Sequence, residues 1–286
     1  MTVVIPKPSR AARDAAIHAR HELERVAREG HQAVYVGGDT VLCRVLGKHM
    51  FYVDGKDRGL APHLIMNGFW EPWITVAMQR FLRPGMICVD VGANLGYFTA
   101  VMADAVGPKG AVVAFEPNPR LLELLRASLF LNGHNGRVCA AQHAVADRDG
   151  DEVFLRFAES LPMNGTICPK NPSGEAVAVK TVTLDTACRR LPRIDLIKID
   201  VEGAEQSVWD GMQGLLDAHP EAVVVLEWNA RRGDAAGLLA KIERRFPNLA
   251  HLDFDGLVEP IDRDRLLHER GGEDFMLWLA GPMAVS

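Results

Sequence analysis

The residues best suited to hold a cofactor are the run Asp90-Val-Gly-Ala-Asn-Leu-Gly96 and the acid Glu116. Gly92 and Gly96 allow the backbone to turn tightly and to approach a ligand where a side chain would collide. A helix that starts after Gly96 would point its free N–H groups and positive dipole end at that ligand. Twenty residues later, Glu116 can accept two hydrogen bonds from a ribose diol. These residues predict a site for a cofactor that contains adenosine.

The glycine spacing separates two classes of cofactor. Dinucleotide sites use the pattern G-x-G-x-x-G, whereas this loop has three residues between Gly92 and Gly96 and carries Asp90 just before them. A carboxylate repels a diphosphate, but it attracts the ammonium group and the positive sulfur of S-adenosylmethionine. Asp90 therefore favours S-adenosylmethionine over NAD, and an ordinary strand-to-helix turn is the alternative.

Three further carboxylates, Asp200, Glu202 and Glu227, follow two later apolar segments. Asp200 and Glu202 would face the same side of an extended chain, and Glu227 would lie beside Asp200 if the two segments pair. Methyl transfer to a hydroxyl needs a group that takes up the proton, and a carboxylate can do so. Three alternatives stay open: one acid contacts the cofactor, Asp200 and Glu202 hold a divalent cation, or they form a structural turn paired with Lys198 or an arginine.

Aromatic side chains near these acids allow two interpretations. Trp228 and Asn229 could contact a sugar, the first by stacking and the second by a hydrogen bond, although a lone tryptophan more often packs in the core. Trp70 and Trp73 are instead expected to cover the edge of the sheet as part of the hydrophobic core.

Residues 76–286 show short apolar segments that alternate with helical stretches. This alternation is typical of a parallel sheet with helices on both faces, and it places the cofactor loop at the carboxyl end of a strand. Two later segments could form an antiparallel edge of the same sheet. The segments expected in the sheet are 86–91, 111–116, 138–146, 196–201 and 222–228, and those expected at its edge are 249–254 and 275–280.

Two regions do not follow this alternation. Residues 1–75 are expected to form an N-terminal extension, with a charged helix over 9–30 and short strands over 32–54, that packs on or dimerises beside the rest. Residues 150–186 contain strand-like segments joined by the turn-rich stretch 163–174. We favour a substrate-side flap for this insertion over a plain surface hairpin, because long loops inside compact domains are commonly functional.

The composition excludes several classes of protein. With 286 residues, 48% of them hydrophobic, the chain suits one large domain or a domain with an appendage. Its net charge of −5 disfavours nucleic acid as a partner. Five cysteines without a CxxC pair fit neither a disulfide framework nor a zinc site. We expect a cytoplasmic protein without a transmembrane segment, because the sequence shows no signal-peptide pattern and no apolar run of membrane-spanning length.

Three blocks of the sequence resemble the FkbM-type S-adenosylmethionine-dependent methyltransferases. They are VDVGANLGYFTAVMA, AFEPNP and TLDTACRRLPRIDLIKIDVEGAEQSVWDGM, which occur in the family's order within residues 71–229. The resemblance implies the Rossmann-like α/β fold of class I methyltransferases, with seven mostly parallel strands, the last of them inserted antiparallel, and helices on both faces. It also implies O-methyl transfer to hydroxyls of glycans, lipid-linked sugars or natural products.

The resemblance adds two residues to the expected cofactor site. Family members carry a glutamate comparable to Glu71, which would lean over the amino end of the cofactor. Class I enzymes place the adenine beside the loop that here contains Ala144. The expected cofactor-binding residues are therefore Glu71, Asp90, Gly92, Asn94, Gly96, Glu116, Pro117, Asn118 and Ala144.

We thus expect an S-adenosylmethionine-dependent O-methyltransferase that acts on a hydroxyl of a sugar, glycan or related natural product. Asp200, Glu202 and Glu227 are its candidate catalytic residues, and a divalent cation at Asp200 and Glu202 is not favoured. The alternatives are an N-methyltransferase, an NAD-dependent oxidoreductase and a non-catalytic cofactor-binding scaffold. An oxidoreductase of this kind would carry a third glycine and a Tyr-x-x-x-Lys pair, which the sequence lacks, and a scaffold would show a damaged loop. The thin apolar stripe of the N-terminal helix would suit a contact between subunits of a homo-oligomer.

Overall fold

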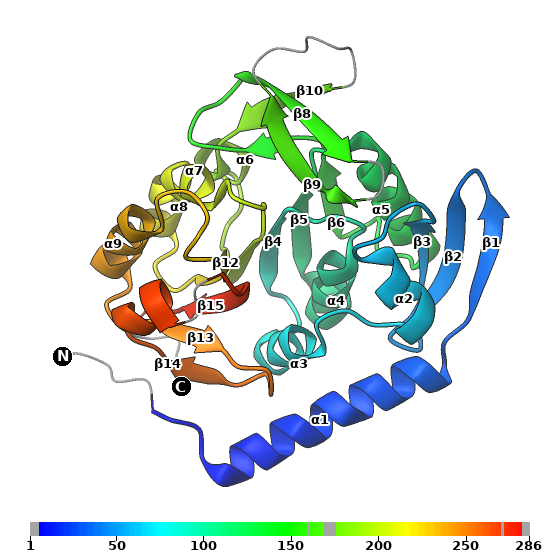
Figure 1. Ribbon diagram of the computed structural model, residues 1–286, viewed down its shortest axis with the longest axis horizontal. Coiled ribbons are helices and arrows are strands. Elements are labelled where there is room, and N and C mark those ends of the chain that lie inside the picture. Colours follow the sequence, from blue (N-terminus) through cyan, green and yellow to red (C-terminus); the bar gives the residue numbers. More distant parts are fainter. Residues whose placement is uncertain (1–5, 159–160, 169–175, 270–271, 282–286) are drawn as a thin grey trace.

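An eight-stranded sheet forms the centre of the computed structural model, which describes residues 6–158, 161–168, 176–269 and 272–281. Its strands are β4 (Ile87–Val91), β5 (Ala111–Phe115), β6 (Val138–Ala141), β11 (Leu196–Ile199), β12 (Val223–Trp228), β13 (Ala250–Leu252), β14 (Val258–Pro260) and β15 (Phe275–Leu279). They lie in the order β14-β13-β15-β12-β11-β4-β5-β6 (Figure 1). The five strands from β12 to β6 in this order pair in parallel, and β15 runs antiparallel to both of its neighbours.

This strand order confirms the predicted class I methyltransferase fold. Seven of its strands form the expected mostly parallel sheet, in which the last strand, β15, is antiparallel. β14 extends this sheet by pairing with β13. The prediction of an antiparallel edge from 249–254 and 275–280 was only partly right. β13 and β15 do pair, but β15 is inserted between β12 and β13, and β14 is the edge strand.

Helices cover both faces of the central sheet. Val223 and Val225 of β12 pack on the side of α3 (Pro72–Phe81) and α4 (Tyr97–Val106). Val224 and Leu226 pack on the opposite side, against α7 (Glu205–Asp210), α8 (Gln213–Ala218) and α9 (Ala235–Arg245). Both faces of the strand are therefore buried, which explains its unbroken apolar sequence. The remaining helices are α2 (Ala61–Asn67), α5 (Pro119–Leu131), α6 (Leu184–Ala187), the 3-10 helix Gly107–Lys109 and the π-helix Arg265–Glu269.

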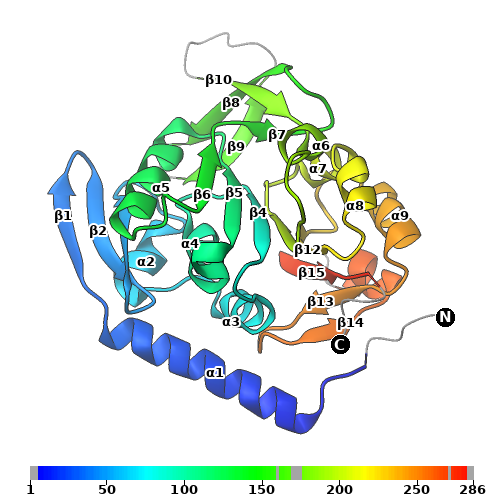
Figure 2. The same cartoon turned by 180° about the vertical axis from the view of Figure 1, so that it is seen from behind.

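The N-terminal region consists of one long helix and a three-stranded antiparallel sheet. α1 (Arg10–Glu29) begins at the N-cap Ser9, whose hydroxyl accepts from the amide of Ala12 at 3.2 Å. It runs along the outside of the molecule, past α3 (Figures 1 and 2). Its residues Ala16 and Ala27 are fully buried within the same chain, whereas Val26 of the apolar stripe keeps 41% of its surface exposed. A homo-oligomer contact through the extension stays a prediction.

The sheet of the N-terminal region packs into the main core. It contains β1 (Ala33–Gly37), β2 (Thr40–Val45) and β3 (His49–Asp54). Buried side chains of β2 and β3 share one hydrophobic cluster with α3 and α4, and the expected division at residue 75 falls inside α3. We propose that the extension and the methyltransferase domain fold as one unit, because they share this core.

A second small sheet has the strand order β7-β10-β8-β9. It consists of β7 (Ala144–Val145), β8 (Glu152–Ala158), β9 (Leu161–Cys168) and β10 (Val177–Val182). The expected turn-rich stretch 163–174 was wrong in its first part, because residues up to Cys168 form β9 and pair with β8. Its later residues, 169–175, lie outside the described part of the chain. The strand expected over 138–146 divides into β6 and β7, and β7 pairs with β10 instead of the central sheet.

None of the helices formed by the described residues is long and apolar enough to cross a membrane.

The backbone segments that follow β4 and β11 lie so close together that only glycine fits at position 92. Gly92 has a φ of +79°, and a Cβ atom there would lie 1.8 Å from the carbonyl oxygen of Asp200. Gly92→Ala should therefore lower the free energy of unfolding by about 3 kcal/mol or more, because the backbone must move apart. Gly85→Ala is the matched control, since Gly85 also has a positive φ (+87°) but open space around it. Its cost should be about 1 kcal/mol in urea denaturation, and equal costs for the two variants would contradict this account.

Candidate functional site

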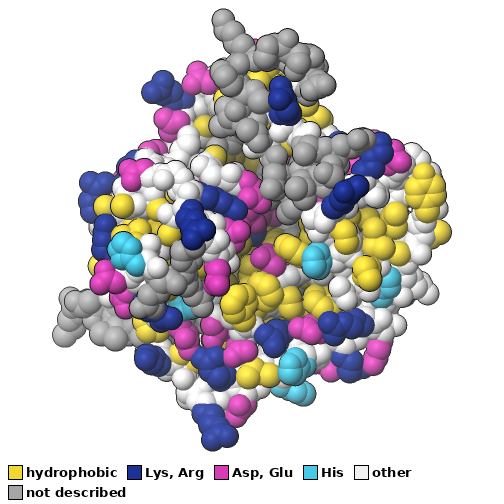
Figure 3. Space-filling view, viewed as in Figure 1, with side chains coloured by type: hydrophobic (Ala, Val, Ile, Leu, Met, Phe, Trp, Pro, Cys, Tyr) yellow, Lys and Arg dark blue, Asp and Glu magenta, His cyan; other side chains and the backbone are white. Residues whose placement is uncertain are grey.

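A cavity opens at the carboxyl ends of β4, β5, β11 and β12, where the strand order reverses between β4 and β11. Its volume is about 1110 Å³, which slightly exceeds the range of roughly 300–1,000 Å³ found for small-molecule sites. Figure 3 shows acidic side chains gathered in a hollow on this face, with hydrophobic side chains beside them. Open α/β sheets bind their ligands at such a reversal point, so this cavity is the candidate site.

The second small sheet forms one wall of the cavity. Val153, Leu155 and Phe157 of β8 line it, and they share one side of the strand because side chains alternate with a period of two. Gly165 of β9 and Thr181 of β10 line it as well. We propose on this ground that the insertion is a substrate-side flap and not a plain surface hairpin.

The predicted cofactor loop connects β4 to α4 at the cavity floor. The amides of Gly92 and Ala93 donate to the carbonyl of Phe115 at 3.0 and 2.9 Å, which ties the loop to the end of β5. The carboxylate of Glu116 accepts from the amides of Asn94 at 2.7 Å and Asn118 at 2.8 Å. Both contacts fix the carboxylate in place while one edge of it lines the cavity. The loop and Glu116 are therefore brought together as predicted.

Most of the predicted cofactor residues line the cavity, and the other two lie at the helix starts next to it. The lining residues are Glu71, Asp90, Gly92, Asn94, Glu116, Pro117 and Ala144. Gly96 instead begins α4 with a φ of +85°, and a Cβ atom there would lie 2.8 Å from Leu125. Asn118 caps α5 by accepting from the amide of Arg120 at 3.0 Å. These two residues shape the loop ends without lining the cavity.

Asp90 is fully buried at the end of β4. Its Oδ2 accepts from the hydroxyl of Thr99 at 2.5 Å, while its Oδ1 has no hydrogen-bond partner among the described residues. Burial raises the pKa of Asp90, and the positive charge of Lys198 opposes that rise. A buried acceptor without a partner beside a cavity is typical of a group that a ligand or a water completes.

Glu71, at the start of α3, also lines the cavity. It is the N-cap residue of α3 and has a φ of +37°, an unfavourable conformation for a residue with a side chain. Burial raises its pKa to about 8, and the nearby charge of Asp200 adds to the rise.

The three candidate catalytic acids come together as a cluster. Oxygen atoms of Asp200, Glu202 and Glu227 all lie within 4.8 Å of one another. Asp200 reaches this position because it follows β11, whose register with β12 places it beside Glu227. The expectation that Glu202 faces the cavity through an extended chain was wrong. Glu202 has a φ of +55°, so a left-handed turn and not a strand directs its side chain.

Two cations hold this cluster together. Lys198 is 2% exposed and its Nζ lies 2.9 Å from Asp200. Arg232 pairs with Glu227, with Glu202 at 2.9 Å and with Asp274 at 3.1 Å. These contacts are the ones expected for a turn paired with Lys198 and an arginine. Burial raises the pKa of Glu227 to about 9, with Asp200 and Glu202 adding to the rise and Arg232 opposing it.

The sequence analysis missed three residues of this site, namely Arg232, Asp274 and Phe254. Arg232 lies five residues beyond Glu227, in the loop that follows β12. That short spacing could have identified it as a partner of the acid cluster. Asp274 and Phe254 line the cavity only because β15 and β13 join this end of the sheet, which no local pattern shows.

The interpretation of Trp228 as a sugar contact was wrong. Its side chain is 2% exposed, and its indole N–H donates to the carbonyl of Leu266 at 3.1 Å, so it belongs to the core. Asn229 donates to the carboxylate of Asp274 at 2.7 Å. Trp70 and Trp73, which we expected only to cover the sheet edge, line the cavity as well.

The sequence profile of the methyltransferase FkbM domain matches residues 90–255, more than half of the chain. The chain belongs to the FkbM methyltransferase family. Family membership confirms the predicted family and an S-adenosylmethionine-dependent methyltransferase activity. It gives no support to the NAD-dependent oxidoreductase or scaffold alternatives.

Three relatives show how far this FkbM-family methyltransferase has diverged. Methyltransferase sdnD of Sordaria araneosa is 30% identical over 54% of this chain and 69% of its own length. The hexuronic acid methyltransferase AglP of Haloferax volcanii is 26% identical over 53% of this chain and 60% of its own. The 31-O-demethyl-FK506 methyltransferase FkbM of Streptomyces tacrolimicus is 30% identical over 46% of this chain and 61% of its own.

The charge of the cavity fits S-adenosylmethionine. Ten acidic residues line it, against one lysine and one arginine, Lys198 and Arg148. A cavity of this sign attracts a ligand that carries a net positive charge. The acidic lining residues are Glu71, Asp90, Glu116, Asp147, Asp151, Asp200, Glu202, Asp210, Glu227 and Asp274.

Glu116→Gln should weaken the binding of S-adenosylhomocysteine by roughly 10- to 100-fold, the loss expected for a charged hydrogen-bond acceptor. Burial raises the pKa of Glu116 to about 7, so wild-type affinity should also fall as the pH drops below 7 and protonation removes an acceptor. Calorimetric titration at pH 6 and pH 8 measures both effects. Glu123→Gln, an exposed position on α5, is the control and should bind like wild type. An unchanged affinity of Glu116→Gln would contradict this placement of the ribose.

Crowding of the carboxylates should make the ligand-free protein less stable at high pH. The pKa of Glu227 rises from an ordinary value near 4.5 to about 9 on folding, so its contribution to stability is lost as the pH rises between these values. Glu227→Gln should therefore flatten the decrease in Tm between pH 5 and pH 9. The exposed Glu221→Gln is the control and should leave that decrease unchanged. The account fails if calorimetry shows the same decrease in Glu227→Gln and wild type.

Proposed function

We propose that this methyltransferase transfers a methyl group to a hydroxyl of a sugar or of a related natural product. The observation that carries the proposal is the cluster of Asp200, Glu202 and Glu227, which lines the same cavity as the cofactor loop. A hydroxyl is a poor nucleophile at neutral pH, and a carboxylate that takes its proton makes it a better one. Relatives whose names include a hexuronic acid and an O-demethylated natural product are consistent with such acceptors.

Different residues of the cavity would bind the cofactor and accept the proton in this reaction. S-adenosylmethionine, when bound, supplies a methyl group attached to a positively charged sulfur. The Gly92–Gly96 loop and Glu116 would hold its adenosine, and Asp90 and Glu71 its positively charged amino-acid end. We propose Glu227 as the base that accepts the proton of the acceptor hydroxyl, because its raised pKa makes it a strong proton acceptor once ionised.

Lys198 and Arg232 supply the positive charge that a divalent cation would otherwise bring to this cluster. Lys198 pairs with Asp200, and Arg232 pairs with Glu202, Glu227 and Asp274. Arg232 bridges three carboxylates and Lys198 pairs with the fourth, so each acid of the cluster has a positive partner without a metal ligand. We therefore propose that methyl transfer proceeds without a metal, and a chelator should leave the activity unchanged.

The test begins with calorimetric titration of S-adenosylhomocysteine, with NAD in a parallel run. Methyl transfer from labelled S-adenosylmethionine is then measured on methyl glycosides and on primary amines, with product masses determined by mass spectrometry. Methylation of glycoside hydroxyls supports the proposal, and methylation of amines alone overturns it in favour of an N-methyltransferase.

Glu227→Gln should lower turnover by roughly 100-fold or more, the usual contribution of a general base. Its affinity for S-adenosylhomocysteine should stay within about twofold of wild type, because the base acts on the acceptor. Glu221→Gln is again the control. If Glu227→Gln keeps wild-type turnover, the base is not Glu227, and Asp200→Asn and Glu202→Gln are the next variants to measure.

A further inference from the structure

An aromatic pair, the exposed Phe254 and the half-buried Trp73, lines one edge of the cavity. Phe254, in the turn between β13 and β14, keeps 52% of its surface exposed, and its ring lies 5.1 Å from that of Trp73 in an edge-to-face arrangement. Both residues line the cavity together with Glu71 and Asp274. Exposed aromatic surface beside carboxylates offers a sugar-like ring two kinds of contact, since the apolar face stacks and the hydroxyls donate hydrogen bonds.

The turn that carries Phe254 is tightly fixed. The carboxylate of Asp253 accepts from the amides of Asp255 and Leu257, both at 2.9 Å. Gly256 has a φ of +80°, and a Cβ atom there would lie 2.8 Å from the carbonyl oxygen of Trp73. The turn therefore lies directly on the backbone of Trp73 and leaves no room for a shift in that direction.

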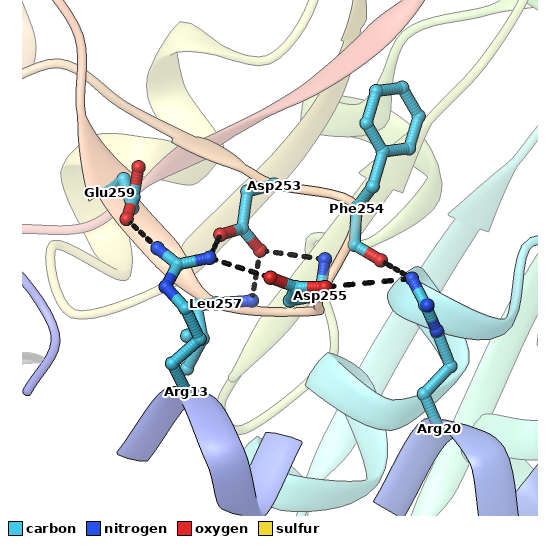
Figure 4. A network of polar contacts seen from close by, with 7 residues as sticks. All are labelled: Arg13, Arg20, Asp253, Phe254, Asp255, Leu257 and Glu259. Carbon is cyan, nitrogen blue, oxygen red and sulfur yellow. Dashed lines mark hydrogen bonds and ion pairs between the residues drawn. The ribbon is translucent and has the colours of Figure 1, made fainter. Parts of the chain in front are cut away.

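Two arginines of α1 hold this turn from the outside (Figure 4). Arg13 pairs with Asp253 at 2.7 Å, with Asp255 at 2.6 Å and with Glu259. Arg20 donates to the carbonyl of Phe254. The ring of Phe254 points away from both guanidinium groups. Without Arg13, these three neighbouring carboxylates would repel one another. We therefore infer that α1 determines the position of the turn, and with it the orientation of the Phe254 ring at the cavity.

The charge of the cavity limits which acceptors can bind there. Ten acidic residues line it, and a bound S-adenosylmethionine, with one net positive charge, offsets only part of that charge. An acceptor that carries a carboxylate or phosphate would add negative charge to a cavity in which Lys198 and Arg232 are already paired with acids. Neutral hydroxyls and ammonium groups would instead donate hydrogen bonds to these acids.

We propose that the acceptor is an uncharged or amino-bearing sugar ring that stacks on Phe254 and Trp73, with Arg13 as the residue that positions Phe254. This inference rests on the proposed function, because it places the acceptor of that reaction. The volume of about 1110 Å³ leaves room for such a ring beside a cofactor. Phe254 is then a specificity-determining residue, and Arg13 acts only through it.

The test measures binding of three probes by ligand-observed NMR in the presence of saturating S-adenosylhomocysteine. The probes are methyl glucoside, methyl glucosaminide and methyl glucuronide, which share one ring and differ in charge. The first two should bind wild type at least tenfold more tightly than the glucuronide. Phe254→Ala should weaken their binding at least tenfold and leave the affinity for S-adenosylhomocysteine unchanged. Phe130→Ala, which removes another exposed phenylalanine, on α5, is the control and should bind like wild type.

A double-mutant cycle separates positioning from a general loss of structure. Arg13→Met should weaken probe binding in the wild-type background and have no further effect in the Phe254→Ala background. A merely structural role of Arg13 would add to the effect of Phe254→Ala and would also lower the affinity for S-adenosylhomocysteine.

The outcomes distinguish this inference from the function on which it rests. If wild type does not bind S-adenosylhomocysteine, the proposed function fails and the inference fails with it. If it binds S-adenosylhomocysteine but binds none of the probes, prefers the glucuronide, or is unaffected by Phe254→Ala, only the acceptor site is overturned.

Discussion

Carboxylates from four neighbouring strand ends share one cavity, and the rest of the site depends on how their repulsion is balanced. Burial raises the pKa of Glu71 and of Glu227, and the charge of Asp200 adds to both rises. Within the described residues, Lys198 and Arg232 provide the direct compensation. A positively charged cofactor adds more compensation, so the repulsion among the acids and the attraction for the cofactor arise from the same charges.

The parts of the site that could be predicted from sequence are those encoded by adjacent residues. The glycines of the cofactor loop and Glu116 are recognisable because a strand, a turn and a helix start follow one another within a few residues. The partnership of Asp200 with Glu227 was accessible as well, because parallel strands that end together bring their following residues together. Family resemblance supplied Glu71, which no local pattern explains.

The remaining parts depend on contacts between distant segments. Phe254 and Asp274 reach the cavity through the insertion of β15 between β12 and β13, an arrangement that the apolar pattern of β15 does not specify. The interpretation of Trp228 failed because a side chain at a strand end can face either the cavity or the core. The indole N–H of Trp228 donates to the carbonyl of Leu266, which holds the side chain in the core. The sequence Asn164-Gly165 is typical of a turn, yet pairing with β8 holds it in β9.

The contact between α1 and the turn at Phe254 joins residues 240 positions apart in the chain. The cofactor loop and the acid cluster have no part in it, so a substitution of Arg13 leaves the hydrogen bonds and ion pairs of both in place. With the acceptor site proposed above, acceptor preference can change through substitutions at the surface of the molecule. A substitution on α1 would change the orientation of the Phe254 ring, while every residue that binds the methyl donor stays the same. Such substitutions give the lineage a route to new acceptors with little loss of methyl transfer.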